Sequence, residues 1–243
     1  MDSTSIYSEH FEVRASEVDT NGKITLSSIC SLFQEVAGNH ALLLNFDITD
    51  LHKQNLTWVL HRMDIKIKRF PKWRESIKIE TWPAAGDSLR AYRNYRILDE
   101  ENNELVVCLS YWMMISMKTR RPVRMTEDIL NTRLSDRDNV LTVRADKIPK
   151  IEEPDSQKEI PVRRSDLDMN QHVNNTRYLE WMSEPLNEGQ ISRVNAIDIL
   201  FLREAVYGDV IQSQVKASEH ESTLHQLKNQ NNEIIAQARF SHS

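Results

Sequence analysis

The chain has 243 residues, of which 40% are hydrophobic and 28% charged, and a formal net charge of −5 at pH 7. This length suffices for one large domain or two ordinary ones, each with a real core. The net negative charge argues against a broad nucleic-acid-binding surface and leaves only local basic clusters to consider.

The first ten residues are polar and carry acids without a basic flank, so they resemble neither a secretory nor an organelle-targeting signal. The longest largely apolar run, residues 105–117, is far shorter than a membrane span of roughly 18 to 20 residues and predicts a buried strand. Cys30 and Cys108 cannot form a disulfide framework and have no metal-ligand spacing. We therefore expect a cytoplasmic protein without a membrane span.

The chain contains an internal repeat. Residues 13–28 align without a gap on residues 162–177, and Val, Arg, Ser, Asp and Asn recur at identical positions. A second match aligns residues 65–77 on residues 199–211. Two copies of one structural unit are therefore predicted.

In the first copy, a helix is followed by strands. From residue 26 to residue 44, apolar side chains recur at three- and four-residue spacing, which is typical of a buried helix capped by Thr25 or Ser27. Alternating polar and apolar residues then predict strands at 65–68, 76–82, 90–97 and 105–115.

The second copy repeats this order. A shorter helix is expected to begin near Asn174 or Asn175 and to end at Pro185. Further strands are predicted at 197–202, 210–216, 223–227 and 233–240. One helix followed by antiparallel strands, twice over, predicts an α+β protein in which each sheet wraps a helix.

Three segments follow from the repeat. The stretch 145–161 contains prolines among many charges and is the expected linker. It separates an N-terminal domain, residues 1–144, from a C-terminal domain, residues 162–243.

A polar motif lies at the start of the second copy. Asp168, Asn170 and His172 occupy alternate positions, so an extended backbone would point all three side chains to one side. The first copy keeps the acid and the amide but lacks the imidazole; its equivalent residues are Asp19, Asn21 and Lys23. Asp168 and Asn170 are therefore explained equally well by capping of a turn.

The motif in residues 165–175, with 178–181, resembles the signature of the acyl-acyl-carrier-protein (acyl-ACP) thioesterases, whose plastid members release fatty acids from the carrier. Segments 58–63, 69–73, 110–114, 119–122 and 202–205 resemble that family as well. The resemblance covers roughly residues 8–240. It implies a double hotdog fold, in which two helix-wrapped antiparallel sheets are joined in one chain.

The resemblance also implies a site in the C-terminal hotdog. The family places catalysis on an Asp, an Asn, a His and a downstream acid, which correspond here to Asp168, Asn170, His172 and Glu204. The first copy has Phe70 at the position of that downstream acid, so we expect one active site per chain. Plant members carry a Cys after the acid, whereas this chain has Ala205, which excludes thiol catalysis there.

Thioester hydrolysis needs an activated nucleophile and donors that polarise the carbonyl group. We expect Glu204, with His172, to activate water. Asn170 and a backbone N–H near the helix start, residues 173–175, would hold the oxyanion. Asp168 would orient the Asn and His side chains or, in an alternative, act as the nucleophile through an acyl anhydride.

Further residues are candidates for binding. Asn174 and Asn175, with the helix residues Leu32, Phe33 and Val36, are predicted to contact the acyl substrate, although such an apolar stripe is more often simple core. Dense basic groups are more often simply solvated faces, but a local patch would steer the acidic carrier; the candidates are Lys68, Arg69, Lys72, Arg120 and Arg121. Residues 166–170 imitate the start of an EF-hand loop, but Gln171 replaces its required Gly, so we expect no metal and no cofactor.

The predicted function is release of free fatty acid from acyl-ACP. Three alternatives stay open: an acyl-CoA thioesterase of hotdog type, a hotdog 3-hydroxyacyl dehydratase, and a non-catalytic acyl-binding module. No nucleic-acid partner is expected, and a homodimer is compatible with the fold. Chain length and saturation preference are not encoded in any spacing.

Overall fold

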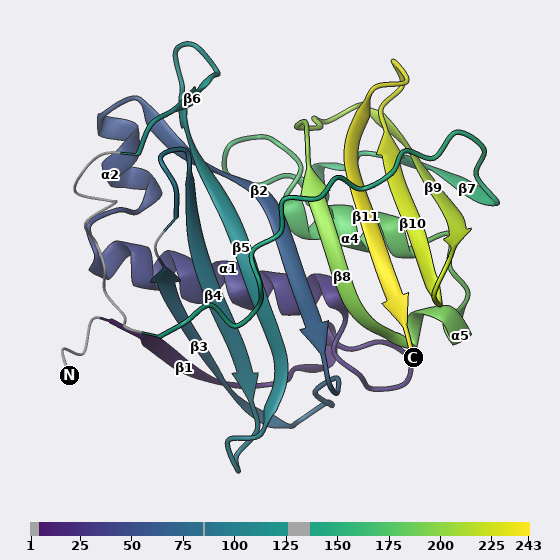
Figure 1. Cartoon of the computed structure of the whole chain (residues 1–243), viewed down its shortest axis with the longest axis horizontal. Helices are drawn as coiled ribbons and strands as arrows, with labels where there is room; N and C mark the ends of the chain where they lie inside the picture. Colours follow the sequence, from purple (N-terminus) through teal and green to yellow (C-terminus); the bar gives the residue numbers. More distant parts are fainter. Residues whose placement is uncertain (1–4, 85, 126–136) are drawn as a thin grey trace. The chain divides into compact units, whose positions relative to one another are not determined.

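The computed structural model describes residues 5–84, 86–125 and 137–243 (Figure 1). Contacts between Cα atoms divide the chain into two compact units, Met1–Val143 and Arg144–Ser243, here called unit 1 and unit 2. In the described part of the chain, no helix combines the length and the apolar character needed to cross a membrane.

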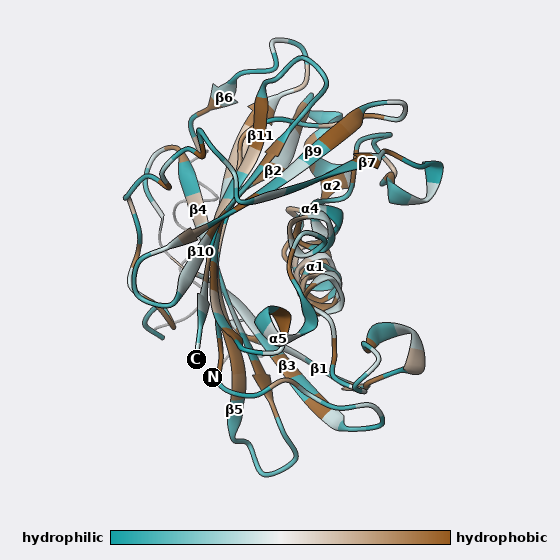
Figure 2. Ribbon diagram, turned by 90° about the vertical axis from the view of Figure 1, so that its right-hand side faces the viewer, coloured by the Kyte–Doolittle hydropathy of each residue, from teal (hydrophilic) through white to brown (hydrophobic). Residues whose placement is uncertain are grey.

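The long helix of unit 1 is α1 (Leu26–Leu43). The hydroxyl oxygen of Thr25 accepts a hydrogen bond from the Ser28 N–H at 3.2 Å, which confirms one of the two predicted caps. The helix lies against the concave face of the unit 1 sheet (Figure 2). Its last turn leaves that face: Leu43, predicted as part of the buried stripe, is 61% exposed.

The strands of unit 1 form an antiparallel sheet in the order β1-β3-β4-β5-β2, with β6 beside β5. The elements are β1 (Tyr7–Glu12), α2 (Ile48–Lys53), β2 (Leu56–Ile67), β3 (Ser76–Ala84), β4 (Arg90–Leu98), β5 (Glu104–Ser116) and β6 (Pro122–Val123). Strand β5 contains the apolar run 105–117 and is buried from Leu105 to Tyr111, as predicted.

Unit 2 repeats this architecture with the strand order β8-β11-β10-β9-β7. Its elements are β7 (Ser156–Pro161), α4 (Asn175–Ser183), α5 (Glu188–Ile191), β8 (Val194–Phe201), β9 (Val210–Ser218), β10 (Ser222–Lys228) and β11 (Ile234–His242). Helix α4 packs on β9 and β10, buries Tyr178, Trp181 and Met182, and ends before Pro185, as predicted. The α+β class is confirmed.

The stretch 145–161 differs from the expected linker. Ile148 and Ile151 are buried against Leu224 of β10, and β7 pairs antiparallel with β9 along the edge of the sheet. The side chains of β7 are largely exposed, so the strand carries no apolar alternation that sequence reasoning detects. Residues 145–161 therefore belong to the fold of unit 2.

Candidate functional site

Residues 168–172 form a tight turn rather than an extended strand. One carboxylate oxygen of Asp168, Oδ1, accepts hydrogen bonds from the backbone N–H groups of Asn170 at 2.8 Å and His172 at 3.2 Å. The Asp168 N–H donates to the His172 carbonyl at 2.8 Å, and Gln171 has a φ of 63°. The three side chains are therefore not arranged as in an extended strand, because Asp168 points back at the backbone of its own turn.

Unit 1 contains the same turn. Oδ1 of Asp19 accepts from the N–H groups of Asn21 at 2.8 Å and Lys23 at 2.9 Å, and Gly22 has a φ of 70°. Because unit 1 has no imidazole here, these hydrogen bonds serve the turn itself. The Asp168 carboxylate has this same structural task, and its contacts to Asn170 and His172 are with their backbones instead of their side chains.

A short 3-10 helix, η2 (Arg164–Asp166), precedes the turn in unit 2. Its Asp166 is fully buried and accepts hydrogen bonds from the Arg163 backbone N–H at 2.8 Å and from the Arg163 guanidinium at 3.0 Å. Burial alone would raise the pKa of Asp166, but the hydrogen bonds and charge of Arg163 outweigh it and hold the pKa below its ordinary value. This buried, ionised group anchors the start of the motif.

The turn docks against the loop between β8 and β9. The Val173 N–H donates to the Ala205 carbonyl oxygen at 2.9 Å, and His172 forms a β-bridge with Val206. Glu204 lies in this loop. The two motifs that the repeat detected separately are thus neighbours in space.

This docking brings His172 and Glu204 together. The distance from His172 Nε2 to Glu204 Oε2 is 3.5 Å, and the two side chains are 29% and 38% exposed. The distance is slightly longer than an ordinary hydrogen bond, as is common for catalytic pairs without substrate. An imidazole and a carboxylate that face each other and reach solvent can together take a proton from water.

The helix start offers fewer free donors than expected. Of the N–H groups at 173–175, that of Val173 binds Ala205, and that of Asn174 binds the Asp166 carbonyl at 2.9 Å. The side chain of Asn174 caps α4 by accepting from the Thr176 N–H at 3.0 Å, so it serves the helix. The Asn175 N–H is the first of α4 and has no acceptor within the helix.

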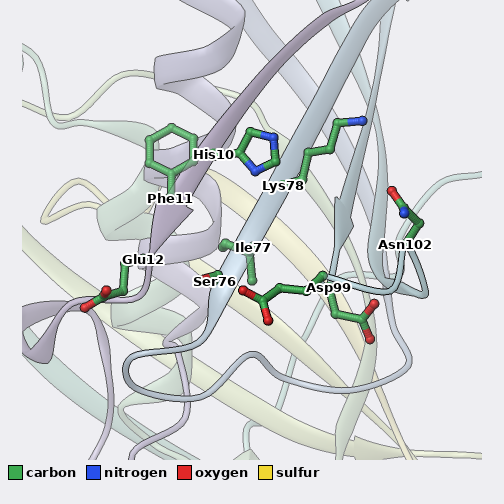
Figure 3. Close-up of a pocket in the computed structure, with 9 residues that line it drawn as sticks. His10, Phe11, Glu12, Ser76, Ile77, Lys78, Asp99 and Asn102 are labelled. Atoms are coloured by element: carbon green, nitrogen blue, oxygen red, sulfur yellow. The ribbon is translucent and has the colours of Figure 1, made fainter.

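The predicted acyl-pocket residues are core residues of unit 1. Leu32, Phe33 and Val36 are buried, and the Phe33 ring stacks on Tyr95 with centroids 4.6 Å apart. A pocket of about 600 Å³ lies elsewhere in unit 1, between β1, the start of β3 and the β4–β5 turn (Figure 3). Its lining mixes the apolar Phe11 and Ile77 with charged and polar side chains, and none of the three predicted residues lines it.

The basic candidates divide into two groups. Lys68 pairs with Glu104 at 2.8 Å, and Arg69 pairs with Glu75 at 2.6 Å. Arg120 and Arg121 lie on the hairpin between β5 and β6, and all four of these residues are exposed. Lys72 is exposed as well.

The described residues provide neither a cluster that could hold a metal ion nor a reactive thiol. Among the described residues, no three His, Cys, Asp or Glu side chains are placed to hold a metal ion. Cys30 is buried, and this burial raises the pKa of its thiol to about 12. Burial also raises the pKa of the Cys108 thiol well above its ordinary value, so neither cysteine is a ready nucleophile.

Two family models match the sequence. Residues 4–132 match the acyl-ACP thioesterase N-terminal domain, and residues 150–243 match the acyl-ACP thioesterase C-terminal domain. An oleoyl-acyl carrier protein thioesterase of Coriandrum sativum chloroplasts is 33% identical over 239 residues, which cover 89% of this chain and 64% of the relative. Oleoyl-acyl carrier protein thioesterase 2 of Arabidopsis thaliana chloroplasts is 31% identical, covering 96% of this chain and 69% of the relative. The chain thus spans about two thirds of these relatives.

Solved structures share the fold. An acyl-ACP thioesterase from Bacteroides thetaiotaomicron superposes with a TM-score of 0.90 at 22% identity over 100% of both chains. A 12:0-ACP thioesterase from Umbellularia californica gives 0.87 at 20% identity over 98% of this chain and 97% of that one. With the repeated arrangement of helix and sheet, this likeness confirms the double hotdog fold.

Proposed function

The chain belongs to the acyl-ACP thioesterase family, and from this premise we propose that it hydrolyses fatty acyl-ACP to free fatty acid and carrier. The observation that carries the proposal is the approach of His172 to Glu204, 3.5 Å apart, in the unit whose copy of the motif has both groups. No cofactor is needed for this reaction.

The proposed chemistry is direct attack by water. Glu204 and His172 take a proton from water while its oxygen bonds to the thioester carbon. The carbonyl oxygen becomes an oxyanion, which the Asn170 side-chain amide and the Asn175 N–H stabilise by about 3 kcal/mol each. The C–S bond then breaks, and the thiolate leaves on the carrier arm and takes up a proton.

The contacts of Asp168 favour water over an anhydride. Its Oδ1 accepts two backbone N–H groups, and Asp19 makes the same pair of bonds in a unit without the base. A carboxylate that holds its own turn together is a poor nucleophile. Single-turnover hydrolysis in isotopically heavy water tests this choice: label in the Asp168 carboxylate would show that the anhydride forms and would overturn direct water attack.

The substrate assignment is tested with a panel of acyl-ACPs of graded chain length, assayed beside the matching acyl-CoAs. Wild type is expected to release free fatty acid fastest from the carrier-linked series, and His172→Ala to lose that activity. Faster turnover of every CoA thioester would favour the acyl-CoA thioesterase instead. An enoyl product would favour the dehydratase, and ligand burial without turnover the acyl-binding module.

Carrier contact and acyl contact are assigned to unit 1. For the carrier, the candidates stay Lys68, Arg69, Lys72, Arg120 and Arg121, all of them exposed. For the acyl chain, the stripe of Leu32, Phe33 and Val36 stays the proposal, tested by the chain-length profile of Phe33→Leu.

The proposed location is the cytoplasm, although the curated plant relatives carry chloroplastic names. Cell fractionation of the full-length protein, probed with an antibody, distinguishes the two.

A further inference from the structure

The hydroxyl group of Tyr178 lies against the loop that carries Glu204. Tyr178 is buried on α4, and its hydroxyl donates a hydrogen bond to the Arg203 carbonyl oxygen at 3.1 Å. Burial raises the pKa of this hydroxyl, and the backbone N–H of Ala205 lowers it by a smaller amount. The hydroxyl therefore contacts the main chain on both sides of Glu204.

Apart from this hydroxyl, both units anchor the loop in the same way. In unit 2, the Val173 N–H binds the Ala205 carbonyl at 2.9 Å, and the Arg203 N–H reaches the Ile235 carbonyl at 3.1 Å. Unit 1 has the corresponding bonds, Ile24 N–H to Pro71 at 2.9 Å and Arg69 N–H to Leu105 at 3.3 Å. The loop thus takes up its fold in unit 1 without any hydroxyl.

The internal repeat provides a comparison at each position. The helix caps Thr25 and Asn174 occupy equivalent positions, so Tyr178 corresponds to Ile29. Ala205 corresponds to Pro71, which has no N–H to offer. Unit 1, which lacks an acid at the position of Glu204, therefore also lacks the tyrosine hydroxyl and the backbone N–H that corresponds to Ala205.

We propose that Tyr178 is a positioning residue: its hydroxyl fixes the main chain at Glu204 so that the carboxylate stays beside the His172 imidazole. This inference rests on the proposed function. His172 is held separately, by the turn that Asp168 closes, so each member of the pair has its own anchor.

The physical reason is the freedom of a half-exposed loop. A glutamate side chain has several rotatable bonds, and movement of its backbone adds to that freedom. A buried hydroxyl whose partners flank the residue removes the backbone contribution. Burial raises the pKa of the Tyr178 hydroxyl, so it stays a neutral donor over the working pH range.

The test compares Tyr178→Phe with Tyr207→Phe, which removes a hydroxyl from an exposed tyrosine of the same loop. Tyr178→Phe is expected to lower kcat for acyl-ACP about 10- to 100-fold with KM nearly unchanged, because small misplacements of catalytic groups cost this much. In a Glu204→Gln background, the same change is expected to cause no further loss. An equal loss in both backgrounds would overturn the proposal, since Tyr178 would then act through the fold in general.

A second measurement does not depend on turnover. The ring resonances of His172, assigned with His172→Ala, are recorded by NMR at fixed pH. We expect Tyr178→Phe to move them in the direction of Glu204→Gln, and Tyr207→Phe to leave them in place. Unchanged His172 resonances in folded Tyr178→Phe would overturn the positioning role, whereas absence of acyl-ACP hydrolysis by wild type would overturn only the proposed function.

A further variant tests the proposal if Tyr178→Phe does not fold. Ala205→Pro removes the second backbone partner of the hydroxyl and also restricts the backbone at Glu204; Pro71 stands at the equivalent position of unit 1. The same displacement of the His172 resonances is expected, and its absence in the folded variant counts against the proposal.

Discussion

Asp19 and Asp168 close the same turn in the two units, and only Asp168 has an imidazole beside it. Each accepts two backbone N–H groups through Oδ1. We predict that Asp19→Ala lowers the free energy of unfolding by about 1–2 kcal/mol, the usual effect of losing such a cap, and leaves turnover of the folded enzyme intact. Asp168→Ala is expected to lose similar stability and also turnover, because His172 is no longer held.

Urea unfolding and steady-state kinetics on the same preparations check this pair. Asp168→Asn is the control, since its amide oxygen still accepts the two N–H groups and should preserve stability. Loss of turnover in folded Asp19→Ala would contradict the assignment of one active site per chain.

His225 of β10 gives a pH dependence of stability. It is buried, its Nδ1 faces the Met182 carbonyl at 3.0 Å, and burial lowers its pKa from 6.5 to about 3. The unfolded chain therefore takes up a proton as the pH falls below 6.5, whereas the folded chain does not until about pH 3. His225 is expected to reduce the free energy of unfolding by up to about 1.4 kcal/mol for each pH unit in that window.

Denaturant unfolding of wild type and His225→Gln between pH 7 and pH 4 measures this contribution. The variant should show a shallower slope of stability against pH, and His220→Gln, at an exposed position, should keep the wild-type slope. Identical slopes for all three proteins would show that His225 is not buried in its neutral form.

For single residues, the sequence predicts which residue types form the site but not all of their contacts. The repeat and the family resemblance together indicated His172 and Glu204, and the structure places these two side chains together. The backbone contacts of Asp168 depend on a turn with a positive φ at Gln171, which alternate spacing does not reveal. The hydrogen bond of the Tyr178 hydroxyl could not be predicted, because helical periodicity shows only that Tyr178 lies on the apolar face of its helix.

Two substitutions in helix α1 test whether its apolar stripe belongs to the core of unit 1. Phe33 is buried and stacks on Tyr95, so Phe33→Ala should lower the free energy of unfolding by about 3–5 kcal/mol. Leu42→Ala, on the exposed last turn of the same helix, should cost less than about 0.5 kcal/mol. Urea titration of both variants checks the difference, and equal effects would contradict the packing of α1.

The elements that the apolar pattern predicted are those with many buried apolar side chains. Helix α1 and strand β5 follow their predicted ranges closely, because apolar side chains define them. The edge strands β1 and β7 were missed, since they pair through their main chains and leave many side chains exposed. Strand β2 begins at Leu56, well before the predicted residue 65. The prediction missed its first half because that half is only partly buried and lacks a strict alternation of polar and apolar residues.

At the scale of the whole molecule, charge should govern the encounter with the carrier. The net charge is −5, so an acidic carrier must approach through a local basic surface. We predict that raising the ionic strength from about 0.05 to 0.3 M lowers kcat/KM for acyl-ACP several-fold and changes that for a short soluble thioester little.

Arg121→Gln, on the β5–β6 hairpin, should reproduce part of this loss at low salt, whereas Lys150→Gln, an exposed lysine of unit 2, should not. Equal sensitivity of both substrates to salt would remove the argument for electrostatic guidance.

The repeat in the sequence was the strongest predictor of the whole molecule. It predicted two units of helix and antiparallel sheet, because both copies contain the same turn residues and the same spacing of apolar residues. It did not foretell that residues 145–161 pack on β10 and join the sheet of unit 2, since such packing depends on contacts distant in the sequence.

The most direct test of the proposed function is the release of free fatty acid from acyl-ACP by wild type, Glu204→Gln and Asn21→Ala. Removal of the carboxylate beside His172 is expected to lower kcat/KM at least about 100-fold, whereas Asn21→Ala, in the copy without a base, should stay within about twofold of wild type. Full activity in folded Glu204→Gln would contradict the assignment of hydrolysis to the His172–Glu204 pair.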